Sequence, residues 1–231
     1  MPVKGERPML NAIEAMLTRR SIREFESTPV PMDVIQKLVE SAGQAPSSKN
    51  TQPWRLYLVQ GAPLEALRND FKVAFDAGTP MKPQYRYSPD PLPTAWSKRA
   101  RDCGIGIFKI KGIAREDKEK RRLHDRANFE FFNAPQVFFL GTNENAYGHG
   151  TLMDCGFVLD NLMLGLAAQG YGSCPQFSVM AYPEILKKHI PGSDDTLFIA
   201  ALPFGVPRKD SVVNTYQPPR LPVAEWFHVV E

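Results

Sequence analysis

The sequence predicts an α+β fold in which helices cover a sheet. Two observations carry this prediction. Stretches with apolar residues on one helical face recur along the chain, whereas only a few short runs are apolar enough for buried strands. A third observation concerns organisation: no internal repeat and no linker-like composition divides the 231 residues. We therefore expect one domain over residues 1–231, with an inserted, lid-like segment at about 78–132.

The N-terminal third predicts two helices, a strand and a third helix, in that order. Residues 11–20 place apolar side chains on one face of a helix. Residues 31–43 form a second amphipathic pattern, which begins at a proline and stops at Gly43. The run "WRLYLV" at 54–59 is typical of a strand, and residues 63–75 again have helical periodicity.

The inserted segment begins with "GTPMKPQYRYSPDPLP" at 78–93, whose five prolines exclude regular structure. Its tyrosines give it apolar surface to pack, so we expect an ordered loop. The run at 114–126 mixes charges of both signs, which favours a solvated helix over a nucleic-acid surface. Four aromatic residues here either line a substrate cavity or belong to the core, which is the commoner case: Tyr85, Trp96, Phe129 and Phe132.

The C-terminal half predicts two buried strands, at 136–142 and 195–205, and two helices, at 151–170 and 180–190. The helix at 151–170 is long and apolar enough to raise the question of a membrane span. Asp154, Asp160 and Asn161 interrupt it, and an unpaired aspartate is costly at a bilayer centre. A core helix ended by Gly170 is the better interpretation, so we expect no membrane partner.

Composition narrows the classes of function. A net charge of +3, without a basic stripe, argues against a nucleic-acid partner. The three cysteines and four histidines are dispersed, which argues against a disulfide framework and a metal site. The N-terminal residues lack the apolar core of a secretory signal. These features predict a cytoplasmic protein.

The stretch "TRRSIREF" at 18–25 places three arginines around one serine. If the chain is extended here, Arg19, Ser21 and Arg23 point to one side, with Arg20 beside them. Guanidinium groups bind phosphate oxygens in pairs and keep their charge, so the cluster suits a phosphate. The alternative is a solvated basic turn at a helix C-terminus, where cations are favoured anyway.

A second polar segment, "APSSKNTQPW" at 45–54, joins a helix to a strand. Its hydroxyl and amide groups can bond the edge of a planar heterocycle, and its prolines stiffen the backbone. A loop rich in turn-forming residues is the alternative.

Taken together, four segments resemble the FMN-dependent nitroreductase family, over essentially the whole chain. They are "RRSIREF", "APSSKNTQPW", "GYGSCPQ" and "PPRLPVAEW", in the family's order, and the second is the most specific. The tyrosine-rich insertion, "GIARED" and "NFEFFNAPQVFF" are similar to the nitrobenzene-type nitroarene reductase branch. The resemblance implies a nitroreductase-like fold with a mainly antiparallel central sheet, in an intertwined homodimer.

The resemblance also implies a set of FMN-binding residues. One group, near the phosphate and ribityl chain, is Arg19, Arg20, Ser21, Arg23 and Arg220. A second group, which the partner subunit supplies against the isoalloxazine, is Pro46, Ser47, Ser48 and Asn50. A third group, along the flavin and its pyrimidine edge, is Pro175, Gln176, Phe177, Ser178 and Asn128. Phe177 replaces a glutamate found in some members, so its contact must use the backbone N–H, and Pro218 replaces a further basic residue.

The implied activity is reduction of nitroaromatic compounds to nitroso and hydroxylamine products in two-electron steps, with NADH or NADPH as donor. Related chemistry on quinones, activated alkenes or halogenated aromatics, or FMN binding without catalysis, remains open. The sequence identifies no catalytic acid or base, no coenzyme preference and no natural substrate. Because the helix at 151–170 has more apolar surface than one packed face needs, we expect a dimer interface there and choose Leu162 to test it.

Overall fold

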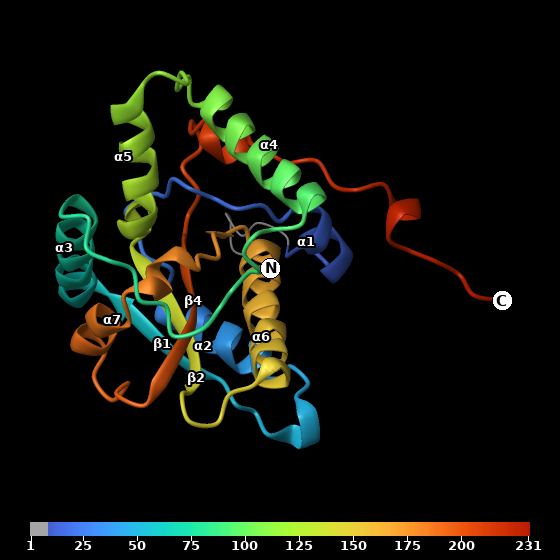
Figure 1. Cartoon of the computed structure of the whole chain (residues 1–231). Helices are drawn as coiled ribbons and strands as arrows, with labels where there is room; N and C mark the ends of the chain where they lie inside the picture. The colour runs from blue at the N-terminus through green and yellow to red at the C-terminus, as the bar shows by residue number, and fades with distance from the viewer. Residues whose placement is uncertain (1–8) are drawn as a thin grey trace, which may run out of the picture.

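The structure is a computed structural model that describes residues 9–231 (Figure 1). Within that range the chain forms the following α-helices: α1 (Ala12–Thr18), α2 (Met32–Ala42), α3 (Gly61–Asp76), α4 (Thr94–Ile110), α5 (Lys118–Phe129), α6 (His149–Ala168) and α7 (Pro183–His189). The strands are β1 (Arg55–Gln60), β2 (Gln136–Asn143), β3 (Gly172–Ser173) and β4 (Thr196–Gly205).

The four strands form one antiparallel sheet in the order β1-β2-β4-β3, which confirms the predicted sheet. β2 and β4 lie at its centre, and burial along both strands is almost complete. Strands buried on both faces need continuous apolar runs, which is why these two segments were readable from sequence. β3 has only two residues and was not predicted.

Helices cover both faces of the sheet. Alternate residues of β2 point to opposite faces, so apolar side chains on each face pack against helices. Phe138 and Leu140 pack with α2 and α6 in one core cluster. Val137 and Phe139 pack with α3 and α7 in the other. The predicted α+β arrangement of a sheet between helices is therefore confirmed.

The predicted helices are present within a few residues of their expected ends. α1 begins at an Asn11 capping box with Glu14, and α2 follows Pro31. Residues 79–93 contain no helix or strand, as their prolines predict. Of the four aromatic residues in doubt, Phe129 and Phe132 are buried in the core, and the Tyr85 hydroxyl donates to the carbonyl of Ile199 at 2.7 Å.

α4 was not predicted, since Gly104 and Gly106 lower its helical propensity. The second glycine has a packing reason. A Cβ on Gly106 would clash with the Tyr216 hydroxyl, which donates to the carbonyl of Cys103 at 3.1 Å. The C-terminal segment therefore packs directly on α4.

α6 is a core helix on one side only. Val158, Leu162 and Leu166 are buried against α2 and the sheet. Its other side exposes Met153 and Phe157, and one third of an 18-residue window with mean hydropathy 1.3 is buried. By length and composition alone α6 could cross a membrane, but its packing against α2 and the sheet agrees with the core helix predicted from the sequence.

The C-terminal segment leaves the body of the protein after β4. It contains two short 3-10 helices, Val213–Thr215 and Val223–Glu225, and its last part runs away from the other elements (Figure 1). Large apolar side chains on this last part are exposed: Val223, Trp226, Phe227, Val229 and Val230.

Candidate functional site

The arginine-rich segment is held in an extended conformation between α1 and the edge strand β3. α1 ends at Thr18, and Arg19 has extended backbone angles. Ser21 forms a parallel bridge to Ser173, and the Ile22 N–H donates to the carbonyl of Ser173 at 2.9 Å. The Ile22 side chain is buried against Gly172, where a Cβ would lie 2.5 Å from it. The polar neighbours of Ile22 therefore remain outside the core.

Five predicted residues line one cavity of about 330 Å³, which we call the cradle cavity. They are Arg19, Arg20, Ser21, Arg23 and Arg220. Residues 216–218, Cys103 of α4 and the end of α1 complete the lining. The structure thus joins the arginine segment to an arginine about 200 positions later in the chain, as the family resemblance implied.

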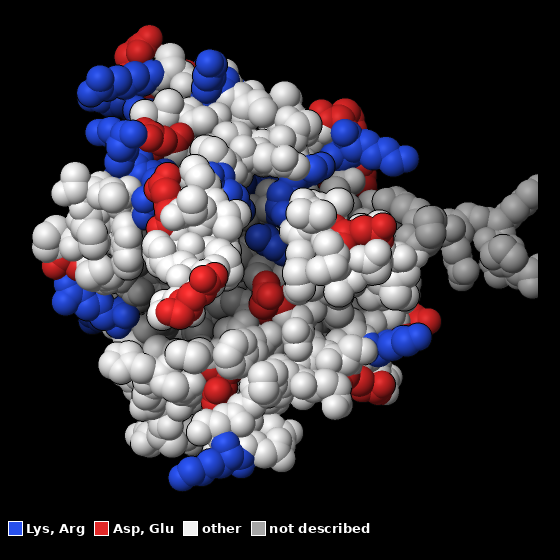
Figure 2. Space-filling view, turned by 90° about the vertical axis from the view of Figure 1, so that its right-hand side faces the viewer, with Lys and Arg blue, Asp and Glu red and all other residues white. Residues whose placement is uncertain are grey.

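The cradle cavity carries positive charge without a counter-charge in the described part of the chain. None of its four arginines forms an ion pair with a carboxylate of residues 9–231. The Arg20 Nε is buried and has no hydrogen-bond partner there. A buried donor without an acceptor is costly, so this atom calls for an anionic ligand. Figure 2 shows Lys and Arg side chains at the upper part of a recess on this face, with Asp and Glu side chains at its lower edge.

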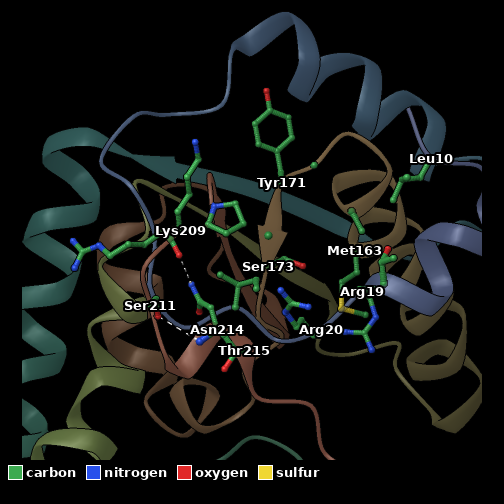
Figure 3. Close-up of a pocket in the computed structure, with 17 residues that line it drawn as sticks. Leu10, Arg19, Arg20, Met163, Tyr171, Ser173, Lys209, Ser211, Asn214 and Thr215 are labelled. Atoms are coloured by element: carbon green, nitrogen blue, oxygen red, sulfur yellow. Dashed lines mark hydrogen bonds between the residues drawn. The ribbon is translucent and has the colours of Figure 1, made fainter. Parts of the chain in front are cut away.

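A second cavity, of about 350 Å³, adjoins the first and shares Arg19 and Arg20 with it (Figure 3). Lys209, Ser173 and Asn214 also line it. The sequence reasoning missed these residues. The pair Arg208 and Lys209 directly after the last strand was the available signal, since a basic pair at the end of a sheet strand extends the charge of the arginine segment.

Asn214 fixes the geometry of both cavities. This buried side chain accepts hydrogen bonds from the backbone N–H groups of Arg23 and Glu24, at 2.8 and 3.2 Å. Its amide nitrogen donates to the carbonyls of Glu24 and Arg208, at 2.8 and 3.4 Å. Asn214 therefore ties the arginine segment to the chain that follows β4.

The segment at Pro175–Ser178 continues from β3 and meets α5. The backbone of Gln176 pairs with Ala201 of β4, and its side-chain nitrogen donates to the carbonyl of Asn128 at 2.9 Å. The Gln176 Oε1 is buried and has no partner within residues 9–231. The Phe177 ring stacks on Tyr87, with 4.1 Å between ring centroids. Asn128 and residues 175–178 are therefore neighbours, and one buried amide oxygen among them lacks a hydrogen-bond donor within residues 9–231.

The loop with Pro46, Ser47, Ser48 and Asn50 lies elsewhere. The Ser48 N–H donates to the Asp154 carboxylate near the start of α6, at 3.2 Å. The arginine segment follows α1, which reaches the other end of α6, where the N–H of Leu10 bonds the carbonyl of Ala168 at 3.0 Å. Fourteen residues of helix separate these two contacts, or ~21 Å. Within one chain, none of these loop residues lines the cradle cavity, and the loop lies at the opposite end of α6 from α1 (Figure 1).

The geometry therefore offers a basic cradle, whose Ser21 bridges to Ser173 of β3, and an amide pair formed by Gln176, three residues after Ser173, and Asn128. The profile of the Nitroreductase family matches residues 16–206, which include the arginine segment of the cradle and residues 175–178 but not Arg220. The chain belongs to the Nitroreductase family. Its match covers the extended arginine segment, the 46–50 loop, the whole sheet and residues 175–178.

Similar family members are named for the reduction of nitroarenes. The chain is 29% identical over 210 residues to a chloronitrobenzene nitroreductase from Comamonas testosteroni, covering 90% of this chain and 92% of that protein. It is 30% identical over 189 residues to a nitrobenzene nitroreductase from Ectopseudomonas oleovorans, covering 81% and 82%.

Solved structures of family members superpose on the whole fold. The FMN- and NADPH-dependent nitroreductase NfnB from sphigopyxis sp. strain HMH aligns with a TM-score of 0.91 at 30% identity, covering 96% of this chain and all of that one. The FMN-dependent NfnB from Mycobacterium smegmatis, solved in complex with NADPH, aligns with a TM-score of 0.89 at 26% identity, covering 95% and 98%. The nitroreductase-like fold predicted from the sequence is confirmed.

Proposed function

We propose that this chain is an FMN-dependent oxidoreductase that uses NADH or NADPH to reduce nitroaromatic compounds to nitroso and hydroxylamine products. The observation that carries the proposal is the cradle cavity. It holds four arginines and a buried donor without a partner among residues 9–231, and these are residues that the family resemblance places at the FMN phosphate and ribityl chain. The names of the similar nitroreductases support the substrate class.

The residues present fit FMN. Arg19, Ser21 and Arg220 would hold the phosphate, since charge-assisted bonds from several directions suit its oxygens. FMN would provide a hydrogen-bond acceptor for the buried Arg20 Nε–H. Arg23 would add positive charge beside the ribityl chain. Asn128 and Gln176 would bond the ring edge, Gln176 with its free oxygen. Pro175 and Ser178 would lie along the flavin, and the Phe177 backbone N–H would face it.

Bound FMN supplies the redox chemistry, because it accepts a hydride from the coenzyme and passes two electrons to the acceptor. Each two-electron step with two protons converts a nitro group to a nitroso group and water, and then a nitroso group to a hydroxylamine. The protein holds, orients and shields the reactants. We propose that the segment at about 78–132 acts as a lid in this role, since its Tyr87 stacks on Phe177 beside the amide-lined edge.

Anaerobic reduction tests the proposed activity. The purified protein should be yellow, should lose flavin absorbance on addition of NADH or NADPH, and should regain it on addition of nitrobenzene. Chromatography should detect the hydroxylamine. Free FMN at equal concentration is the control. A quinone and a halophenol, assayed in parallel, separate nitroarene reduction from the related reductive chemistries. If neither coenzyme reduced the bound flavin, the proposed activity would be wrong and the chain would be an FMN-binding protein without catalysis.

We also propose that the working form is an intertwined homodimer with flavin sites built from both chains. Two features support it. The 46–50 loop is ~21 Å along α6 from the end that carries the cradle, so a partner's loop is the natural complement to this cradle. The free side of α6 and the C-terminal segment both expose large apolar side chains, which a second chain would bury.

The dimer proposal predicts that Phe157→Arg will produce a monomer. Phe157 is 42% exposed on the free side of α6, so the arginine is tolerated in one chain but is buried without a partner in the dimer. FMN affinity should fall together with dimerisation. Sedimentation and flavin absorbance over a dilution series would measure both.

The control for this test is Val73→Arg, at an exposed apolar position on α3, and it should stay dimeric. Leu162, the residue chosen from the sequence, is unsuitable. Its side chain is fully buried in the chain's own core, so Leu162→Arg would unfold the monomer itself. A Phe157→Arg monomer that retains full FMN affinity would contradict the two-chain site.

A cytoplasmic location without a membrane partner completes the proposal. The three cysteines are unpaired in the structure, which suits a reducing compartment. A second chain on the exposed side of α6 would account for its apolar residues without a bilayer.

A further inference from the structure

A third cavity, of about 180 Å³, lies on the other side of Arg23 from the cradle cavity. It is bounded by the arginine segment, the end of α4, α5 and the residues after β4. Its lining residues are Arg23, Glu24, Phe25, Lys111, His124, Ala127, Phe132, Asn133 and Arg208. Neither the family resemblance nor the proposed FMN site uses Lys111, His124 or Arg208.

The charges around this third cavity are unbalanced. Four basic side chains line it against one carboxylate, that of Glu24, which lies 4.0 Å from the Arg208 guanidinium. The Lys111 ammonium lies 3.3 Å from the His124 Nδ1, a hydrogen bond in which the unprotonated ring nitrogen accepts. Protonation of the His124 ring would replace this bond with two positive charges side by side, and an anion bound next to both groups would reduce their repulsion.

The titration behaviour agrees with this geometry. Burial lowers the pKa of His124, and the positive charges of Lys111 and Arg23 lower it further, against the opposing carboxylate of Asp125. Burial also lowers the pKa of Lys111, with Arg23 adding to the effect and Glu24 opposing it. Each basic group is therefore harder to protonate than in water, chiefly because burial disfavours its charged form.

The basic groups are held in place by packing. The His124 ring meets Phe108 of α4 edge-on, with 5.1 Å between ring centroids, and the Arg121 guanidinium lies 4.6 Å from the centre of the same Phe108 ring. These contacts fix α4 against α5 and keep Lys111 beside His124. On the opposite wall, Asn214 holds the backbone of Arg23 and Glu24. Donors fixed before the ligand arrives lose little entropy on binding.

We propose that the third cavity is a binding site for a phosphate group. Donors approach it from at least three elements, namely the arginine segment, α4 and α5, and the amide of Asn133 adds another. A tetrahedral anion with oxygens in four directions suits donors spread in this way better than a planar carboxylate does. The phosphate is either free or carried by a nucleotide such as NADPH. The second source rests on the proposed function.

Inorganic phosphate, titrated into the FMN-loaded protein in phosphate-free buffer, tests the site itself. FMN occupies the cradle cavity during this titration. The proton resonances of the His124 ring, assigned through His124→Asn, should move toward their protonated positions as phosphate raises the pKa of that ring. Lys111→Ala and His124→Asn should each weaken phosphate binding by roughly tenfold, the loss of one charge-assisted bond.

Two variants make this result specific. Lys109→Ala removes an exposed charge from the same last turn of α4 without touching the cavity, and should bind phosphate as the unmodified protein does. Lys111→Arg keeps the charge and should retain most of the affinity. No movement of the His124 resonances up to tens of millimolar phosphate, or equal weakening by Lys109→Ala, would overturn the proposal.

Binding of the oxidised coenzymes distinguishes the two sources. If NADPH supplies the phosphate, NADP⁺ should bind at least tenfold more tightly than NAD⁺, and Lys111→Ala should remove that difference while leaving NAD⁺ binding unchanged. If free phosphate is the ligand, NADP⁺ and NAD⁺ should bind equally while phosphate still moves the His124 resonances. These readouts involve no turnover, so a failure of nitroarene reduction would not affect them.

Discussion

The double variant Arg19→Ala and Arg220→Ala should purify almost without flavin. Each arginine lines the cradle cavity, and each can make a charge-assisted bond to a phosphate. Such a bond contributes ~1.5–3 kcal/mol, so losing two should weaken FMN binding by a hundredfold or more. Because Arg220 is exposed to solvent, its bond to the phosphate should contribute an energy near the lower end of this range. Flavin fluorescence during titration of the FMN-free protein measures the affinity.

The folded protein should be unaffected by this double variant, because neither side chain takes part in the core. The thermal midpoint of the FMN-free form should therefore stay within about 2 °C of that of the unmodified FMN-free protein. The control is Arg115→Ala, which removes one positive charge at an exposed position outside the three cavities. This variant should keep its flavin. Full flavin content in the double variant would refute the assignment of the cradle cavity to phosphate.

Much of this site was predictable, since the arginine segment combines a local pattern with a simple charge argument. Period-two alternation places Arg19, Ser21 and Arg23 on one side, and a guanidinium cannot lose its charge. The sheet was predictable for a similar reason, because strands buried on both faces need apolar runs such as that of β4.

Other parts depend on contacts that a single sequence does not reveal. α4 has two interior glycines, and only the folded chain brings Tyr216 against Gly106. Phe131, Phe132 and Asn133 have left-handed backbone angles, with φ between 52° and 55°, which local preference disfavours for the two phenylalanines. The buried Arg68 supports this strained turn, bonding the carbonyls of Glu130 and Ala134 on either side of it. Tertiary contacts here outweigh local propensity.

The exposed side of α6 shows the same limit in another form. Its composition predicted an apolar helix with surface to spare, but not which residues face outward. Leu162 and Phe157 are both apolar, yet the first is fully buried and the second is 42% exposed. The difference follows from the rotation of α6 against α2 and the sheet, which the packing of the whole core determines.

Asn214→Leu should be among the most destabilising single substitutions in the C-terminal segment. The leucine has a similar size but offers no donor or acceptor. Two backbone N–H groups and two carbonyls would lose their partner at a buried position. At ~1–3 kcal/mol for each unsatisfied group, and with two of the four bonds long, the loss should be about 3–5 kcal/mol of unfolding free energy. For a chain of this size that lowers the thermal midpoint by on the order of 10 °C.

The same substitution should weaken FMN binding even at temperatures where the protein remains folded. Asn214 holds the backbone of Arg23 and Glu24 to residue 208, so its loss frees the segment that shapes the cradle cavity. Asn214→Asp keeps the acceptor but loses the donor, and should give an intermediate effect on both properties. Thr215→Ala, next to it and exposed, removes one surface hydroxyl and is the control. Calorimetry and flavin titration on the three variants would give matched series. If stability fell while FMN affinity stayed constant, Asn214 would be a purely structural residue and the cradle would not depend on the segment after β4.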